Sequence, residues 1–282
     1  MIPAEFDYHR AESVGDAISA LADGGEGAKL LAGGHSLLPL MKLRLAAPSL
    51  LVDISGLDEL RGVEQANGGW TIGGGSRHAE LEDRNDLGVV ARAASLIADQ
   101  QVRNRGTIGG SLAHGDPASD LPAVLLAAKG EVETQGGGGR RTISAADLFR
   151  DLWDTSLAAD EVITAVRFPP LDGWGWGYEK YSRRAEDWAM VGVCALVKAA
   201  DGSCEDARIG LTNMGTTPLR ATAAEEALRG QSLSAEGIAA AAEQAAQGTE
   251  PPGDLNATPE YKRHLARVLT RRALEQAAGL RD

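Results

Sequence analysis

Two segments of the sequence carry a glycine pair followed by a small hydroxyl residue. The first reads LLAGGHSLLPLMKLRL over residues 30–45, and the second reads TIGGSLAHGDPASDLP over residues 107–122. Glycine lets the backbone take positive φ and approach a ligand closely, so consecutive N–H groups can converge on one anion. Neither glycine pair has Lys or Arg beside it, so amide dipoles would balance the negative charge. Two such loops predict a ligand with two phosphates.

A glycine pair also has a simpler interpretation as a tight turn, because a short glycine pattern alone is a weak indicator of function. The sequence lacks both the G-x-G-x-x-G fingerprint and a Walker P-loop. The segment GWGWG at 173–177 has the wrong spacing, and no helix is expected after it. A dinucleotide would therefore bind outside a Rossmann crevice.

The remaining polar clusters offer little chemistry. His114 and Asp116 would be two metal ligands without a third, which makes a poor site. The stretch GHSLL lacks the closing glycine of a nucleophile elbow, so His35 is expected to orient the loop or meet a phosphate. We expect neither a catalytic dyad nor a metal site. Four arginines suit an anionic acceptor, a partner surface or plain solvent exposure: Arg103, Arg105, Arg183 and Arg184.

The pattern of apolar and turn residues places these loops on an α+β framework. Helices are expected over 12–23, 86–98, 121–130, 218–229, 233–247 and 258–279, with short helices after Ser36 and Ser144. Strands are expected near 28–31, 50–54 and 70–73, as a hairpin over 131–144, and over 161–168, 190–200 and 203–212. The segment 171–190 is expected to be a linker. We therefore predict a first domain at 1–172, and a second at 176–282 with a sheet covered by helices.

The bulk composition limits the partners. The chain has 282 residues, of which 43% are hydrophobic, and a net charge of −12, which disfavours nucleic acid and anionic membranes. No run of 18 apolar residues predicts a membrane span, and the N-terminus lacks the layout of a signal peptide. We expect a cytoplasmic protein, with at most a loose association with the membrane.

The two cysteines lie on a predicted hairpin that turns at Asp201-Gly202. This register places Cys204 opposite Ala199 and Cys194 opposite Ile209, so the two thiols should stay free and inert. Two cysteines cannot hold a four-thiolate iron–sulfur cluster, so any such cluster would sit on another chain.

Four motifs in this order resemble one known family: AGGHSLLPLMKLRLA, RNRGTIGGSLAHGDPASDLPAVLLA, YEKYSRRAEDWA and IGLTNMGTTPLRA. They are similar to the flavoproteins of the molybdenum hydroxylases, with the medium subunits of aerobic carbon monoxide dehydrogenases nearest and the flavin domain of xanthine dehydrogenases more distant. The resemblance covers nearly the whole chain. It implies a fold of the p-cresol methylhydroxylase (PCMH) and vanillyl-alcohol oxidase (VAO) type, with two α+β subdomains around FAD and a C-terminal domain after them.

The resemblance also implies cofactor-binding residues. Asp120 would meet the adenosine end of FAD, and Ile163 the adenine or ribose. Lys180 would lie near the pyrimidine edge of the flavin, Trp188 beside the isoalloxazine ring, and Ile97 on another apolar wall. The two diphosphate loops comprise Leu31, Ala32, Gly33, Gly34, His35, Ser36 and Leu37, and Thr107, Ile108, Gly109, Gly110 and Ser111.

These residue types suit a flavin. A cation near N1 and O2 stabilises the anionic reduced ring and raises its potential, which makes Lys180 the candidate for tuning. Trp188 could lie against the ring. The alternatives are a surface lysine in a charged linker and a tryptophan of the core.

The resemblance further implies an electron-transfer subunit without acid–base work of its own. A large partner would carry the molybdopterin cofactor and oxidise the substrate, and a small partner would carry 2Fe–2S clusters. Two heterotrimers would form a heterohexamer that reduces an external acceptor (quinone, NAD or oxygen). Carbon monoxide is the expected substrate, with xanthine, other N-heterocycles or aldehydes as alternatives. A stand-alone flavin oxidoreductase and a scaffold that has lost FAD are the remaining hypotheses.

Overall fold

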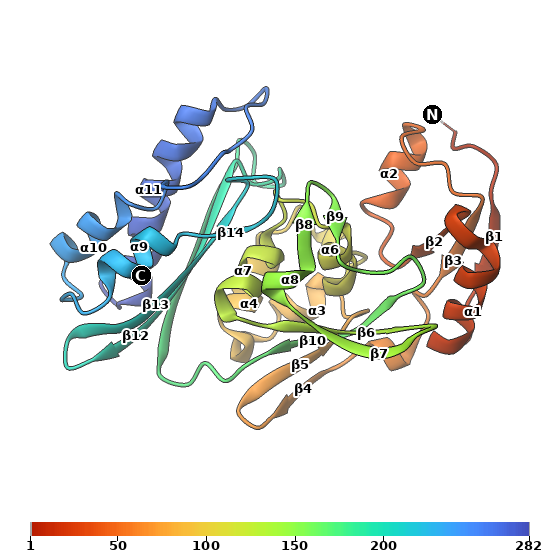
Figure 1. Cartoon of the computed structure of the whole chain (residues 1–282), viewed down its shortest axis with the longest axis horizontal. Coiled ribbons are helices and arrows are strands. Elements are labelled where there is room, and N and C mark those ends of the chain that lie inside the picture. The colour runs from red at the N-terminus through yellow and green to blue at the C-terminus, as the bar shows by residue number, and fades with distance from the viewer. Residues whose placement is uncertain (1, 282) are drawn as a thin grey trace.

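The N-terminal part of the chain forms a small parallel sheet. In a computed structural model that describes residues 2–281, three strands pair in the order β1-β3-β2, and helix α1 (Val14–Gly24) packs against them (Figure 1). Ser13 caps α1 by accepting a hydrogen bond from the N–H of Asp16. The first glycine loop leaves this sheet at the end of β2. The strands are β1 (Asp7–Arg10), β2 (Ala28–Leu31) and β3 (Leu50–Asp53).

A five-stranded antiparallel sheet comes next, with the order β4-β5-β10-β6-β7. Helix α7 (Asp120–Ala128) is buried on nearly all sides because it lies between this sheet and the C-terminal one, where it contacts β12 and β13. The strands are β4 (Val63–Ala66), β5 (Gly69–Gly73), β6 (Glu131–Gly136), β7 (Gly139–Ser144) and β10 (Val162–Phe168). The other helices here are α3 (His78–Glu82), α4 (Val89–Ser95), α5 (Gln100–Arg103), α6 (Ile108–His114) and α8 (Ala145–Leu148).

The C-terminal sheet has four antiparallel strands in chain order, and three helices cover one of its faces (Figure 1). The long helix α11 (Pro259–Ala277) packs along β11 and β12, as its amphipathic sequence predicted. The strands are β11 (Trp174–Tyr181), β12 (Val191–Ala200), β13 (Ser203–Thr212) and β14 (Leu219–Arg220), and the two shorter helices are α9 (Thr222–Leu228) and α10 (Ala235–Ala242).

The expected α+β class is confirmed, but the segment expected as a linker is strand β11. Its glycines serve packing rather than flexibility. A Cβ atom on Gly175 would overlap the carbonyl oxygen of Ala277, and one on Gly177 would overlap that of Ala273. Helix α11 therefore approaches the strand closely, and the two glycines that made the segment look irregular are what this contact requires.

The hairpin of β12 and β13 pairs Cys204 with Ala199, as predicted. The prediction for Cys194 is wrong by one residue. It faces Gly210 rather than Ile209, because the register shifts by a bulge between Lys198 and Ala199. Both thiols are free and buried, and burial raises the pKa of Cys194 to about 12 and that of Cys204 to about 11. They are thus unreactive at neutral pH.

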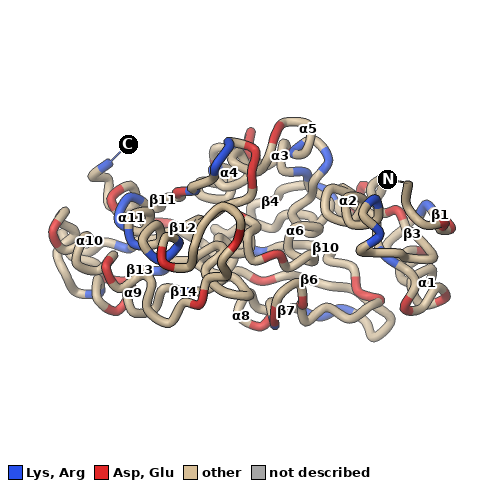
Figure 2. The backbone as a smooth tube through the Cα atoms, turned by 90° about the horizontal axis from the view of Figure 1, so that it is seen from above, with Lys and Arg blue, Asp and Glu red and all other residues tan. Residues whose placement is uncertain are grey.

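Charged residues of both signs occur along all parts of the chain (Figure 2). Across residues 2–281, no helix is long and apolar enough to cross a membrane.

Candidate functional site

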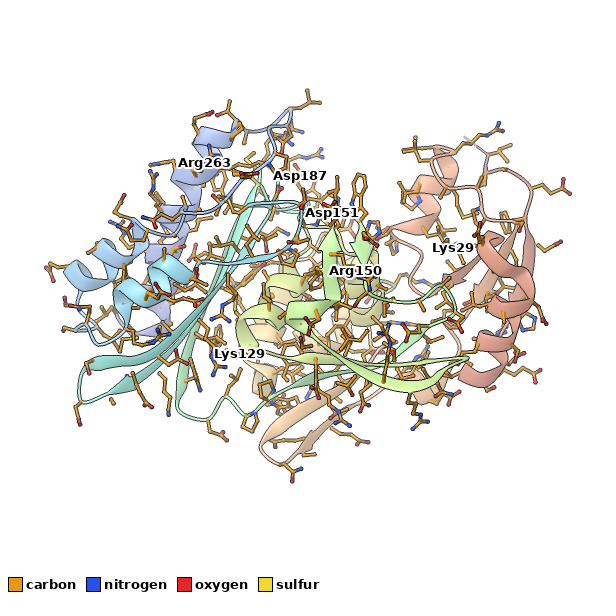
Figure 3. All side chains as sticks on the ribbon, viewed as in Figure 1. Lys29, Lys129, Arg150, Asp151, Asp187 and Arg263 are labelled. Carbon is orange, nitrogen blue, oxygen red and sulfur yellow. The ribbon has the colours of Figure 1, made fainter. Side chains whose placement is uncertain are left out.

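One large cavity, of about 690 Å³, lies where the three sheets meet. Its walls come from the first glycine loop and α2 (Leu37–Lys42), from α6, from the start of β10, and from the segment between β11 and β12. Figure 3 labels two lining residues from its two sides, Lys29 on β2 and Asp187 after β11. The volume is in the range of a cofactor site. All the residues predicted to bind FAD line this cavity, with the exception of Ile108.

The first glycine loop turns sharply between β2 and α2. Gly34 has a φ of +76°, which a residue with a side chain rarely adopts. A Cβ atom on Gly33 would overlap the backbone at Arg105 and Gly106, so the first loop rests directly on the segment that leads into the second. Both glycines are therefore required by the backbone path.

The amides of this loop are available to a ligand. Within residues 2–281, the backbone N–H groups from Ala32 to Ser36 donate to no acceptor of the protein. Such a run of free donors on the wall of a cavity is what an oxyanion needs. The first loop thus fits the phosphates of a dinucleotide.

The second loop differs from the expected cradle, because its amides are already bonded. Thr107 caps α6, and its Oγ1 accepts from Gly110 N at 3.1 Å while its carbonyl accepts from Ser111 N at 3.0 Å. Ile108 N donates to the carbonyl of Ser76, and Gly109 N to that of Gly74. The side chain of Ile108 is fully buried in the core. What this loop offers the cavity is therefore its hydroxyl side chains and its close packing.

At the other end of the cavity, a buried ion pair joins α7 to β11. Lys180 Nζ lies 2.9 Å from Asp120 Oδ2 and also donates to the carbonyl of Leu96 at 2.8 Å. Burial raises the pKa of Asp120, although Lys180 and Tyr178 oppose this shift. The resemblance implied that Asp120 and Lys180 lie at opposite ends of FAD, whereas the structure brings the two side chains into direct contact.

The side chain of Arg103 fixes the backbone of the cavity wall at Ile97. Ala98 has a φ of +43°, and Arg103 Nη1 donates to the carbonyls of Ile97 and Ala98, each at 3.0 Å. Arg103 also pairs with Glu82 at 2.8 Å, and both side chains are largely buried. Arg103 therefore supports the cavity wall, and this engagement explains its presence without a docking role.

The aromatic residues of the site lie at its mouth. Trp188 is 55% exposed, so it is not a core tryptophan, while Ile163 is buried on β10. Trp153, which no sequence motif indicated, is 62% exposed and lines the same cavity. Trp153 occupies the turn between β8 (Phe149–Asp151) and β9 (Asp154–Thr155) with a φ of +55°. Only the tertiary fold brings this turn to the cavity, so no local pattern could have shown it.

His78 is a second lining residue that no sequence motif indicated. It lines the cavity yet is only 5% exposed, and its Nδ1 atom has no hydrogen-bond partner in the described part of the chain. Burial, reinforced by the charges of Arg103 and His35, lowers the pKa of His78 to about 4. The imidazole is therefore neutral at physiological pH. Within residues 2–281, no cluster of three or more acidic, His or Cys side chains is arranged to hold a metal ion.

Two family models match the chain. The FAD binding domain in molybdopterin dehydrogenase matches residues 4–171, and the CO dehydrogenase flavoprotein C-terminal domain matches residues 176–277. The chain belongs to the FAD-binding family of molybdopterin dehydrogenases. This membership confirms the resemblance found in the sequence and the expected oxidoreductase class, and the free amides and tight glycines of the first loop fit that cofactor.

Individual relatives are similar to this chain over nearly the full length of both proteins. The chain is 41% identical to the carbon monoxide dehydrogenase medium chain of Hydrogenophaga pseudoflava, with 98% of each chain covered. It is 40% identical to the 6-hydroxypseudooxynicotine dehydrogenase complex subunit alpha of Paenarthrobacter nicotinovorans, covering 98% of this chain and 96% of the relative. It also matches a structure of carbon monoxide dehydrogenase from Hydrogenophaga pseudoflava, which lacks the Mo-pyranopterin moiety, at 42% identity and a TM-score of 0.95 with both chains fully covered. These relatives confirm the expected fold.

Proposed function

We propose that this chain binds FAD in the central cavity and relays electrons for a molybdenum hydroxylase that oxidises carbon monoxide. The observation that carries the proposal is the row of free amides on the first glycine loop, inside a cavity large enough for a dinucleotide. The likeness to the carbon monoxide dehydrogenase medium chain, in sequence and in structure, supports the choice of substrate.

The cavity provides two chemically different ends for the cofactor. We place the diphosphate on the loop from Leu31 to Leu37, where the amides replace the water that would otherwise solvate it. The hydroxyls of Thr107 and Ser111 complete this end. The adenosine then lies toward Ile163 on β10, whose neighbour Val162 packs into the core of the first sheet.

The flavin ring belongs at the opposite end, among Ile97, Lys180 and Trp188. We place Asp120 at this end as well, because its side chain is paired with that of Lys180. Bound FAD supplies one-electron and two-electron chemistry there. Trp188 covers the ring from solvent in part, and the rigid wall at Ile97 fixes its position from the other side.

The cysteine content of the chain bears on its partners. The two cysteines are both buried on the C-terminal sheet, so the 2Fe–2S clusters and the molybdopterin cofactor belong to a small and a large partner subunit. We propose a dimer of such heterotrimers in the cytoplasm, with a quinone, NAD or oxygen as acceptor. We also propose that the chain divides into domains at 1–172 and 176–282, which the two separate family models support.

A reconstituted complex tests this function. The chain is coexpressed with a large molybdopterin subunit and a small iron–sulfur subunit, and the absorbance of bound FAD at about 450 nm is followed after substrate is added. Carbon monoxide should bleach the flavin within the turnover time of the complex. A complex that leaves the flavin oxidised under carbon monoxide, but reduces it with a hydroxylated nicotine derivative, contradicts the proposed substrate.

An N-heterocycle is the second candidate substrate. The 6-hydroxypseudooxynicotine dehydrogenase subunit is 40% identical, against 41% for the carbon monoxide relative. The same reconstitution separates the two, since it compares both substrates on one preparation.

A further inference from the structure

Three side chains form a buried polar cluster behind the flavin end of the cavity. Tyr178 and Lys180 lie two residues apart on β11 and therefore project from the same face of the strand. Asp120 is the first residue of α7 and lies between them. Tyr178 and Asp120 are 1% and 4% exposed, and the side chain of Lys180 is 4% exposed. Such a cluster carries a large electrostatic effect because water does not screen it.

One N–H donor of the Lys180 ammonium group is not used by the hydrogen bonds within the cluster. An ammonium group has three N–H donors. Lys180 gives one to Asp120 and one to the carbonyl of Leu96, and the described residues offer no acceptor for the third. Because Lys180 also lines the cavity, the third donor is free for a ligand there. Both oxygens of Asp120 are occupied, since Tyr178 donates to Oδ1 at 2.6 Å.

The charge of the cluster is balanced within the protein. Lys180 and Asp120 together carry no net charge, whichever of them holds the shared proton. A carboxylate 2.9 Å from the ammonium cancels much of its field at longer distance. Lys180 is thus not the lone cation that the sequence motif alone suggested.

We propose that Asp120 sets the reduction potential of the bound flavin by offsetting the positive charge of Lys180. This inference rests on the proposed function, because it requires FAD in the cavity with its ring at this end. A lone ammonium would favour the anionic reduced ring strongly, whereas the balanced pair favours it only weakly. Tyr178 is the positioning residue that keeps Asp120 beside Lys180.

The experiment is a set of charge-removing variants measured on the full chain loaded with FAD. Asp120→Asn, Lys180→Gln and the double variant are compared with wild type by spectroelectrochemical titration of the bound flavin. Glu133→Gln serves as the control, because Glu133 pairs with Arg167 away from the cavity. Thermal unfolding and FAD content are recorded for each variant.

Removing the carboxylate should raise the potential, and removing the ammonium should lower it. Each change is expected to alter the equilibrium constant for flavin reduction by about tenfold, as for a unit charge near a partly buried site. The double variant has no unpaired buried charge, so it should fold well and return close to the wild-type potential.

Two outcomes overturn the inference alone. In the first, Asp120→Asn binds FAD with a potential that is unchanged or lower. In the second, the double variant has the same potential as Lys180→Gln at a pH high enough to ionise the buried carboxyl of Asp120 in Lys180→Gln, which would mean that Asp120 has no electrostatic role. The second outcome decides the matter even where Asp120→Asn fails to fold. Wild-type protein that binds no FAD overturns the proposed function instead, and the inference with it.

Discussion

The two glycine loops look alike in sequence and differ in what their backbones do. In the first, the amides from Ala32 to Ser36 have no acceptor within the described chain. In the second, the four amides from Ile108 to Ser111 are all bonded inside the protein. A glycine pair followed by a hydroxyl residue therefore occurs in two different structures. The first is a loop with free backbone N–H donors, which we call the donor loop, and the second is the tightly packed N-terminus of a helix.

The difference comes from the backbone path immediately after each glycine pair. The second pair lies at the start of α6, so its amides donate to the helix cap and to neighbouring carbonyls. Gly109 has no side chain, which allows the backbone of Gly74 to approach closely. The first pair makes a turn with Gly34 at positive φ before α2 begins at Leu37. The amides of that turn lie outside any helix or ladder, which leaves them for a ligand.

The largest expected effect comes from a side chain in the donor loop. Gly33→Val should weaken FAD binding at least about a hundredfold, because its Cβ overlaps the backbone at Arg105 and moves the free amides. Fluorescence titration with FAD measures this. Gly138→Val is the matched control, since a Cβ atom at Gly138 would meet nothing within 4 Å. Equal affinities for the two variants would show that the first loop does not hold the cofactor.

His78 packs against Gly106, directly before the second loop, and lies close enough to His35 of the first loop for their charges to interact. Its pKa is about 4 in the folded chain against an ordinary 6.5, so the unfolded chain binds more protons between these values. Its contribution to stability is therefore complete above pH 6.5 and is lost as pH falls toward 4, by roughly 3 kcal/mol. Denaturant unfolding at several pH values should show that the free energy of unfolding of the wild type falls between pH 6.5 and pH 4. The fall should be smaller in His78→Gln. An equal fall in the variant would mean that other groups cause it.

The second loop should respond in stability rather than in affinity. Gly109→Ala places a Cβ 2.5 Å from the carbonyl oxygen of Gly74, and the backbone must shift to accommodate it. We expect the free energy of unfolding to fall by about 2 kcal/mol, with FAD affinity changed far less than in Gly33→Val. Chemical unfolding and FAD titration on the same preparation give both numbers. A large loss of FAD affinity with an unchanged free energy of unfolding would contradict the distinction between the two loops.

The smallest expected effect is that of the helix cap. Thr107→Val removes the hydroxyl that accepts from Gly110 N, which should lower the free energy of unfolding by about 1 kcal/mol. FAD affinity should fall by only a few fold, from loss of one hydroxyl at the cavity. Urea unfolding with parallel titration checks both values. A loss of binding as large as that of Gly33→Val would make Thr107 a principal ligand.

Much of the site was predictable because it lies in local sequence. The motifs located both glycine loops and the segment after β11, because each of these binding segments is continuous in the chain, whereas much of the remaining lining, such as His78 and the residues from Trp153 to Glu161, lies outside them. Hydrogen-bond partners were not predictable, because the carbonyls of Gly74 and Ser76 that engage the second loop come from a different segment. The pairing of Asp120 with Lys180 likewise depends on how α7 meets β11.

The fold shows the same division. Periodic helices and alternating strands were evident from the sequence, as for α11 and the β12–β13 hairpin. Strand β11 was not, because Gly175 and Gly177 have low strand propensity and are explained only by the helix that packs on them. Trp153 was missed for a related reason, since a turn between two very short strands leaves no periodic signal.

Amide hydrogen exchange with and without FAD, resolved to single residues, tests the central claim most directly. The amides from Ala32 to Ser36 should exchange freely in the protein alone and become protected when FAD is added. Those from Ile108 to Ser111 should be protected in both states, because their acceptors lie within the protein. Continued free exchange of the first set in FAD-saturated protein would contradict the account.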